Sequence, residues 1–277
     1  MAGLPVFLID NIYSERQYPG HVVSATENST NAWKVADGRR HGLSKWTTVT
    51  TNTTCWMMVT CTATCTTDFV AIDRGHNLGG STFQVQGSVD GTNYTNVASF
   101  VIPATTATFD VDAASGGLTE EGAFLKRYTA ASYAWWRIAS LSLGAGLTQQ
   151  ITGLWVGQSI EMRIFDFPWT DDEHMLFGPV TTTQWGWEGV GDVNARRQGN
   201  IGLRCRDSTD FTNMRTHIVE NFGRRRRPMW IVPDQAQADR SVLAVRDING
   251  VWGTHFDGSW PERRVNFGWI EHEPKRP

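Results

Sequence analysis

The sequence predicts a mostly β protein with two domains, and three observations support this prediction. Stretches that alternate Thr or Val with polar residues dominate, with 11 Thr in residues 47–67 alone, and such alternation is typical of strands. Few windows place apolar residues at the three- and four-residue spacing that a helix needs. The length of 277 residues corresponds to roughly two domains at about 150 residues each.

Seven short strands are expected in the first half, where turn signals such as Asp90-Gly91 and Gly116-Gly117 separate them. Strands of this number and spacing favour a β-sandwich. The expected strands are Thr47–Thr53, Cys55–Cys61, Phe69–Asp73, Ser81–Ser88, Ala98–Ile102, Trp135–Ser140 and Ile151–Gln158.

The second half is also predicted to be rich in strands, with one short helix over Asp210–Phe222. Asp210 is the expected cap and Gly223 the expected stop. One face of this helix is apolar, through Phe211, Met214, Ile218 and Phe222. The expected strands are Ile160–Phe165, Gln184–Trp187, Gly199–Asp207, Arg227–Val232, Ser241–Asp247, Val251–His255 and Val265–His272.

A change in charge density near Gly157 marks the expected domain boundary. Residues 1–158 contain 9 Lys/Arg and 11 Asp/Glu, whereas the shorter remainder contains 16 and 17. The predicted domains are therefore residues 1–158 and 159–277. No low-complexity linker separates them, which indicates a rigid junction.

The overall charge and hydropathy exclude several classes of protein. A net charge of −3 is unlike the strongly basic domains of general nucleic-acid binders. No run of about 18 apolar residues is present, so no membrane-spanning helix is expected. The N-terminal stretch Met1–Gly20 lacks a basic region before its apolar part, so no signal peptide is expected and the chain should fold in a cytosol.

Three of the four cysteines lie between Cys55 and Cys65, with five and three residues between successive ones. These spacings match no zinc finger or ribbon, so no metal site is predicted from them. In a strand, Cys55, Cys61 and Cys65 share one face, which favours reduced core thiols. A late disulfide and a metal site are the alternatives.

Motifs of common catalytic sites are absent, including G-x-S-x-G, H-E-x-x-H and the Walker loop, so no enzyme is expected. Paired carboxylates of a glycosidase are an alternative, because a sequence does not show their separation in space. The densest acidic cluster, Asp171–His174, could bind a cation. It follows Pro168-Trp169-Thr170 and is expected to be a solvated turn or a helix start.

Five motifs in the first half occur in a recognisable order. They are Ser24–Glu27, Ala32–Arg39 with its Asp37-Gly38 pair, Asp68–Gly75, Phe83–Tyr94 with its Ser88-Val-Asp90-Gly91 hairpin signal, and Ala134–Ile138. Residues 20–158 with these motifs resemble the discoidin or coagulation-factor C-type module, a galactose-binding-like jelly-roll sandwich. Tyr94 and Trp136 are expected as core anchors. Arg137 is expected to pair with a buried carboxylate such as Asp73.

The resemblance implies a ligand site, because members of that family bind glycans, lipids or proteins through loops at one end. The corresponding loops here are Glu27–Asn31, Arg39–Trp46 and Gly75–Gly79. The candidate ligand-binding residues are Trp33, Asp37, Arg39, Trp46 and His76. Calcium near Asp37 is the one cofactor that the resemblance would allow. The alternative is that Asp37 closes a turn and both tryptophans pack the core.

Four consecutive arginines, Arg224–Arg227, follow the predicted helix and precede an apolar strand. Arginine favours ion pairs at interfaces, so a subunit contact is expected there. A solvated basic loop is the alternative. Nucleic-acid binding is not expected, because the surrounding charge is balanced. The candidate assembly residues are Arg224, Arg225, Arg226, Arg227 and Trp230.

The order of elements in residues 159–277 resembles small tail-tip and distal-tail-like proteins of tailed phages. It consists of the strand Gly199–Arg206, the helix, the stretch Arg227–Asp234, a strand from Ser241 and a Trp-containing end. The resemblance implies a structural virion protein of the tail tip or baseplate. It would assemble with other tail proteins in the host cytoplasm, as a ring or trimer. The alternative is a glycan-binding module for host-surface recognition.

Overall fold

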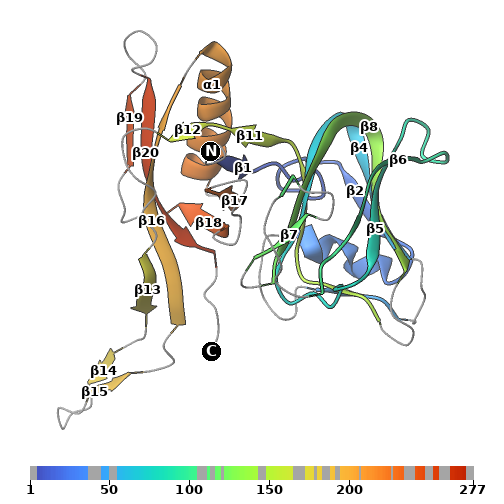
Figure 1. Ribbon diagram of the computed structural model, residues 1–277, viewed down its shortest axis with the longest axis horizontal. Coiled ribbons are helices and arrows are strands. Elements are labelled where there is room, and N and C mark those ends of the chain that lie inside the picture. Colours follow the sequence, from blue (N-terminus) through green and yellow to red (C-terminus); the bar gives the residue numbers. More distant parts are fainter. Residues whose placement is uncertain are drawn as a thin grey trace. The chain divides into compact units, whose positions relative to one another are not determined.

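The computed structural model describes most of the chain, and the structural statements below concern this part (Figure 1). The described residues are 5–36, 45–49, 55–104, 111–112, 116–119, 122–142, 148–164, 172–177, 180–182, 188–190, 194–205, 207–225, 227–233, 241–246, 252–255 and 263–272.

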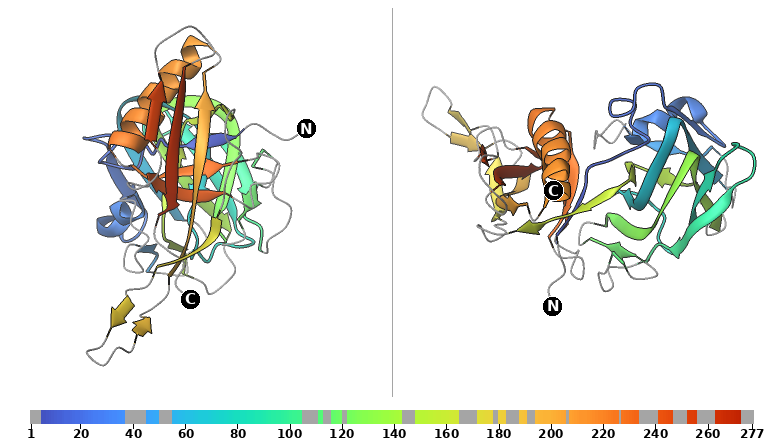
Figure 2. Two further views of the ribbon diagram at one scale, coloured as in Figure 1. Left: turned by 90° about the vertical axis from the view of Figure 1, so that its left-hand side faces the viewer. Right: turned by 90° about the horizontal axis from the view of Figure 1, so that it is seen from above.

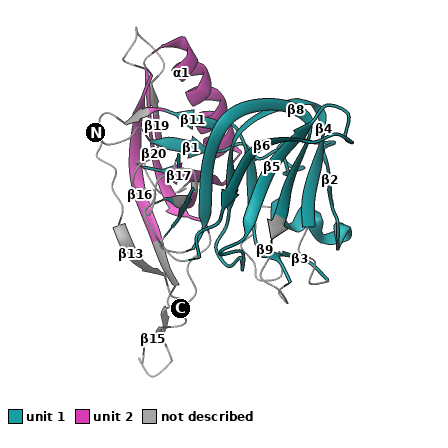
Figure 3. Ribbon diagram, turned by 45° about the vertical axis from the view of Figure 1, so that its right-hand side comes forward, with its two compact units in different colours: residues 1–161, 232–241 teal, residues 162–231, 242–277 magenta. Residues whose placement is uncertain are grey.

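Two compact units divide the chain, and the chain passes between them three times (Figure 3). The first unit contains Met1–Glu161 and Val232–Ser241, and the second contains Met162–Ile231 and Val242–Pro277. The expected boundary after residue 158 lies close to the first passage, which follows Glu161. Among the described residues, no helix is long and apolar enough to cross a membrane.

Two long strands, β4 (Cys55–Ile72) and β8 (Phe124–Ser142), organise the first unit by pairing antiparallel along most of their length. β2 (Val22–Ala25) pairs with the first half of β4, and β10 (Leu154–Gly157) pairs with the second half. The two ends of β8 also pair with different strands. Its last residues pair with β5 (Thr82–Ser88), which pairs with β6 (Thr95–Val101), and its first residues pair with β7 (Gly117–Leu118).

The two halves of these long strands face each other across one core. Met57 and Val59 from the first half of β4 belong to the same buried cluster as Val70 and Ile72 from its second half. Figure 1 shows β4 and β8 arching over from one layer to the other. The first unit is therefore an antiparallel sandwich whose layers are joined by continuous strands.

A bulge in β4 lies where the strand passes between the layers. Thr60 pairs with Trp135 and Cys65 pairs with Tyr133, so four residues of β4 stand opposite one residue of β8. The indole Nε1 of buried Trp136 donates to the carbonyl oxygens of Cys65 and Tyr133, at 3.2 and 3.1 Å. Bulges bend strands and increase their twist, which accounts for the change of layer.

Short elements complete the first unit. β3 (Trp46–Thr47) pairs with β9 (Gln150–Ile151), and β1 (Val6–Leu8) pairs with β11 (Ser159–Glu161). A 3-10 helix, η1, spans Ser29–Ala36, and no helix was expected there. Asn28, which precedes it, has φ of 50°, a left-handed conformation that asparagine tolerates better than most residues.

The second unit is an antiparallel sheet with a helix packed on one face (Figure 2). The sheet order is β17 (Met229–Val232), β18 (Val242–Arg246), β20 (Arg264–Glu271), β16 (Asn194–Arg204) and β12 (Arg163–Ile164). In addition, β13 (Asp172–Phe177) pairs with β16, and β19 (Trp252–His255) pairs with β20. β14 (Val180–Thr182) and β15 (Glu188–Val190) form a separate pair.

The helix begins as α1 (Ser208–Asn213) and continues with π-type hydrogen bonding as η2 (Met214–Arg224). Met214, Ile218 and Phe222 are buried, as expected of the apolar face. The Phe222 ring packs on Phe267 of β20, with centroids 5.2 Å apart. Burial of this face explains why the one good helical pattern in the chain forms a helix.

The mostly β fold, with a sandwich in the first half and one helix in the strand-rich second half, is confirmed. The expected helix cap was wrong, because the side chain of Asp207 accepts the amides of Thr209 and Asp210, at 2.8 and 3.0 Å. The acidic segment at Asp172–His174 lies in strand β13 instead of a turn or a helix. The expected strand Gln184–Trp187 lies outside the described residues.

Two expectations about the motif residues were also wrong. The Arg137 guanidinium does not pair with Asp73: its Nε donates to Gln86 Oε1 at 2.5 Å, and its Cζ lies 3.8 Å from the centre of the Tyr94 ring. Tyr94 is therefore part of a half-buried cation–π contact and not a core anchor. Trp136 is a core residue, as expected, with 1% of its surface exposed.

Gly157 in β10 provides a test of the packing. A Cβ atom there would lie 2.5 Å from the carbonyl oxygen of Asp10. The backbone fixes the positions of both atoms, so no side-chain rotation can relieve the clash. We expect Gly157→Ala to lower the free energy of unfolding by about 1–3 kcal/mol, measured by chemical denaturation. Gly253→Ala is the control, because its Cβ would meet nothing within 4 Å. Equal stability of the two variants would contradict the packing described here.

Candidate functional site

Three segments meet at one end of the first unit. The Glu27 side chain accepts the Val49 amide at 2.7 Å, and the Asn28 side chain donates to the Thr47 carbonyl at 3.2 Å. β3 then pairs with β9, which contacts the loop after β4. The expected loops Glu27–Asn31 and Gly75–Gly79 are therefore linked through β3 and β9. Figure 3 shows β3 and β9 at the end of this unit where η1 also lies.

Hydrogen bonds between side chains and backbone groups, and not strand pairing, hold the loop after β4. Asn77 donates from Nδ2 to the Thr148 carbonyl at 2.6 Å and accepts the Gln150 amide at 2.7 Å. Gln150 Nε2 donates to the Gly75 carbonyl at 2.9 Å, and Thr152 Oγ1 donates to the Arg74 carbonyl at 2.6 Å. This network fixes the loop in one conformation, as a preorganised binding loop requires.

Trp33 is the aromatic side chain that this end exposes most among the described residues. It lies on η1, where Ala32, Val35 and Ala36 are buried against the core. Trp33 points away from that face and keeps 54% of its surface exposed. The helix is thus anchored by its small apolar residues and presents a large aromatic ring to solvent.

Trp46 lies in the core, with 1% of its surface exposed. Its indole Nε1 donates to the Glu27 carbonyl at 2.9 Å, which ties β3 to the segment before η1. A buried ring offers no face to a ligand, so Trp46 supports the site from beneath. The alternative expectation, that the two tryptophans pack the core, is correct for Trp46 and incorrect for Trp33.

His76 is partly buried in the loop after β4. Its Nδ1 accepts the Leu78 amide at 3.2 Å, which assigns the ring proton to Nε2. Burial is the main cause that lowers the pKa of this imidazole, and it outweighs the opposite effects of Asp73 and the Gly122 backbone. The neutral ring is therefore favoured. Asp37 and Arg39, the remaining candidates, lie outside the described residues, as does the expected calcium position.

The candidate assembly residues occupy different environments in the second unit. Arg224 is exposed and pairs with Glu220 at 2.6 Å, one helical turn earlier. Arg225 is exposed, and Arg227 Nη1 donates to Asn221 Oδ1 at 3.2 Å. Trp230 is buried in β17, with 1% of its surface exposed, so its ring is covered by this chain and does not face solvent. Arg226 lies outside the described residues.

Sequence reasoning missed one group of side chains in the first unit. His21, Cys61 and Cys65 offer ligand atoms that all lie within 4.8 Å of one another. A hydrogen bond between the two thiols raises the pKa of Cys61 and lowers that of Cys65. The two cysteines could be found in the sequence, but the histidine lies far earlier in the chain and no spacing rule connects it to them.

The buried imidazole of His76 makes stability depend on pH. Because burial lowers its pKa in the folded state, the unfolded chain, with a histidine pKa of about 6.5, takes up the proton first. The contribution of neutral His76 is complete above that pH and is lost as the pH falls toward the folded pKa. We expect His76→Asn, which keeps an acceptor for the Leu78 amide, to lose less Tm between about pH 7 and 5. Parallel pH curves of Tm for variant and wild type would contradict this.

Comparisons with known proteins give similarity only at the level of three-dimensional structure. No protein-family model matches the chain, and no curated protein sequence matches it. Among solved structures, chitosan-binding module 1 of a chitosanase/glucanase from Paenibacillus sp. IK-5 is 17% identical. It has a TM-score of 0.39, and the match covers 53% of this chain and 97% of the module.

Two further structures show the same kind of similarity. A CBM32 module from Clostridium perfringens, in complex with GalNAc-β-1,3-galactose, is 13% identical with a TM-score of 0.38, and the match covers 50% of this chain and 94% of the module. A GH29 fucosidase from Ruminococcus gnavus, in complex with fucose, is 14% identical with a TM-score of 0.40. That match covers 55% of this chain and 27% of the fucosidase. Carbohydrate-binding modules are thus among the solved structures that this chain is similar to.

Proposed function

We propose that the first unit is a non-catalytic carbohydrate-binding module, and that the end carrying η1, β3 and the loop after β4 holds the ligand. This is the glycan-binding alternative of the sequence analysis. The ligand class is the one named for the modules described above, but the proposal rests on the residues of this chain.

The exposed ring of Trp33 is the observation that carries the proposal. Burying an exposed indole against an apolar surface is favourable, and the C–H face of a pyranose offers such a surface. η1 holds the ring through three buried residues, so little conformational entropy would be lost when a sugar binds. Trp33 stacks on the sugar in this proposal, and Trp46 holds the underlying segments together.

Polar side chains at the same end supply hydrogen-bonding groups for sugar hydroxyls. Lys45 and Asn77 are exposed, and Lys45 Nζ lies 3.2 Å from Gln150 Oε1. Lysine contributes donors. The amides of Asn77 and Gln150 already take part in the hydrogen bonds that hold the loop, but an amide has two N–H donors and two acceptor lone pairs, so each can also bond to a sugar hydroxyl. A few fixed polar groups beside an aromatic surface are the usual composition of a small-ligand site.

A glycan array followed by calorimetry tests the proposal. We expect residues 1–277 to bind a defined set of glycans and Trp33→Ala to weaken that binding about tenfold, which corresponds to about 1.4 kcal/mol. Val89→Ala is the control, because Val89 is 74% exposed on the hairpin between β5 and β6. Circular dichroism would establish that both variants fold. Absence of binding to every glycan, or equal affinity of Trp33→Ala and wild type, would refute the proposal.

A second candidate function, assembly into a phage tail, is favoured by the exposed arginines at the end of η2. We propose that Arg225 and its neighbours contact another copy or another tail protein through ion pairs. Arg225→Glu is expected to lower the oligomeric state or the incorporation into particles, measured by mass photometry and by analysis of purified virions. Arg215→Glu, on an exposed position of the same helix, is the control. Normal assembly of Arg225→Glu would remove this role.

A further inference from the structure

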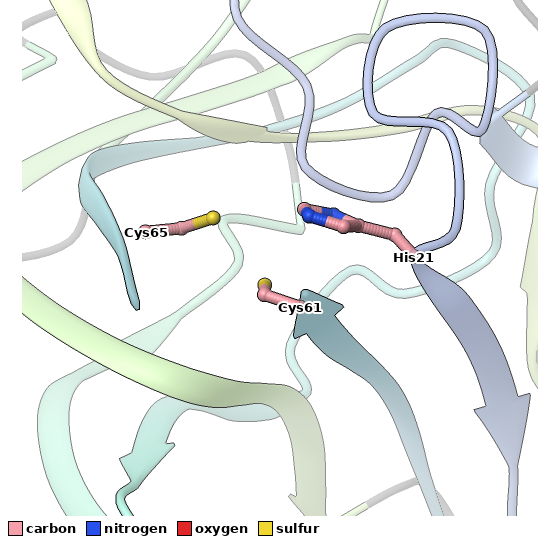
Figure 4. Close-up of side chains that lie close together, drawn as sticks. All are labelled: His21, Cys61 and Cys65. Atoms are coloured by element: carbon pink, nitrogen blue, oxygen red, sulfur yellow. The ribbon is translucent and has the colours of Figure 1, made fainter. Parts of the chain in front are cut away.

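A histidine and two cysteines converge inside the first unit, away from the proposed carbohydrate site. His21 immediately precedes β2, whereas Cys61 and Cys65 delimit the bulge of β4. Figure 4 shows the three side chains pointing toward a common space from these two segments. Their ligand atoms all lie within 4.8 Å of one another.

The separation of these atoms is close to what a zinc ion requires. Zinc binds thiolates at about 2.3 Å and imidazole nitrogen at about 2.0–2.1 Å in tetrahedral geometry, which places ligand atoms about 3.6–3.8 Å apart. No separation here exceeds 4.8 Å, so shifts of about 1 Å would complete the geometry. Such shifts are small for side chains on an irregular segment such as a bulge.

The imidazole of His21 is already oriented as metal-binding histidines are. Its Nδ1 lies 2.9 Å from the backbone carbonyl of Ile12, and this contact places the ring proton on Nδ1. Nε2 then carries the lone pair that can bind a metal. A hydrogen bond from the second ring nitrogen to a carbonyl is the usual outer contact of a metal-bound histidine.

The surroundings hold the three groups in place. The Tyr18 ring stacks on His21 with centroids 4.7 Å apart, and the Tyr18 hydroxyl donates to the Asp10 carboxylate. Gly20 has φ of 89°, and a Cβ atom there would lie 3.1 Å from Thr62 Cγ2. The loop before β2 therefore approaches the bulge so closely that glycine is needed at position 20.

We propose that His21, Cys61 and Cys65 form a zinc site in which Cys61 and Cys65 bind as thiolates and His21 binds through Nε2. Two thiolates neutralise the charge of the ion, and soft thiolate ligands select zinc over magnesium or calcium. Cys65 is half-buried, and a water molecule would complete the tetrahedral coordination. The ion would fasten the loop before β2 to the bulge where β4 changes layers.

Cobalt titration of the full chain tests the site. The protein is stripped with a chelator and kept reduced with a phosphine, and Co²⁺ then reports thiolate ligands through charge-transfer absorption. We expect saturation at one Co²⁺ per chain and loss of the absorption when one equivalent of Zn²⁺ is added. Cys65→Ser and His21→Gln should each weaken Co²⁺ binding at least about tenfold. Cys55→Ala, on the same strand but outside the cluster, should leave the titration unchanged.

A second test adds protection of Cys65 from alkylation, which is measured on the wild-type chain and does not depend on how a variant folds. Zn²⁺ should slow alkylation of Cys65 in the wild-type chain, measured by mass spectrometry, and should raise the Tm of wild type but not of Cys65→Ser. Absence of charge-transfer absorption in the reduced wild-type chain would overturn the proposal, as would identical titrations of wild type and Cys65→Ser. A Cys61–Cys65 disulfide that forms in air, in a chain that binds no Co²⁺ after reduction, would also overturn it and assign the pair to redox chemistry.

Discussion

The pairing of β4 with β8 is the constraint on which the first unit depends. Each strand belongs to both layers of the sandwich, so the layers cannot separate or slide without breaking this ladder. A shift of one residue would also turn every core side chain of β4 toward solvent. The register is fixed where the strand bends, because the indole of Trp136 bonds to the Cys65 and Tyr133 carbonyls. One buried tryptophan thus satisfies polar groups that the bulge removes from the ladder.

The two proposed sites use this framework differently. At one end, β3, β9 and the loop after β4 are joined by side-chain hydrogen bonds above a buried Trp46, and the aromatic surface is carried by a short helix. At the bulge, the same irregularity that moves β4 between layers brings Cys61 and Cys65 toward His21. A regular strand directs successive side chains to opposite faces. In both places, irregular backbone brings together polar or metal-binding side chains that a regular strand would separate.

Local patterns were enough to predict the fold class but not the way strands are shared. Alternation identified both ends of β4, yet the Thr-rich stretch Thr62–Thr66 concealed that one strand connects them. The helix face was predictable because Met214, Ile218 and Phe222 follow helical spacing, whereas its cap was placed at Asp210 instead of Asp207. The exposure of Trp33 and the burial of Trp46 and Trp230 depend on tertiary packing, which composition does not encode. The contact of His21 with the cysteines is likewise long-range.

The separation of β4 and β8 along the sequence also affects how fast the first unit can fold. Its innermost pair joins Ile72 to Phe124 and its outermost pair joins Cys55 to Ser140, so a long loop must close before the strands stabilise each other. Topologies dominated by such distant contacts fold slowly, on the millisecond to second scale. On a ribosome, β4 would leave the exit tunnel well before β8, so its buried face, which includes Met57, Val59 and Val70, would stay uncovered until β8 emerges. Aggregation-prone segments combine high β-propensity with high hydrophobicity, and the threonine hydroxyls of β4 keep the unpaired strand less hydrophobic than valines at the same positions would.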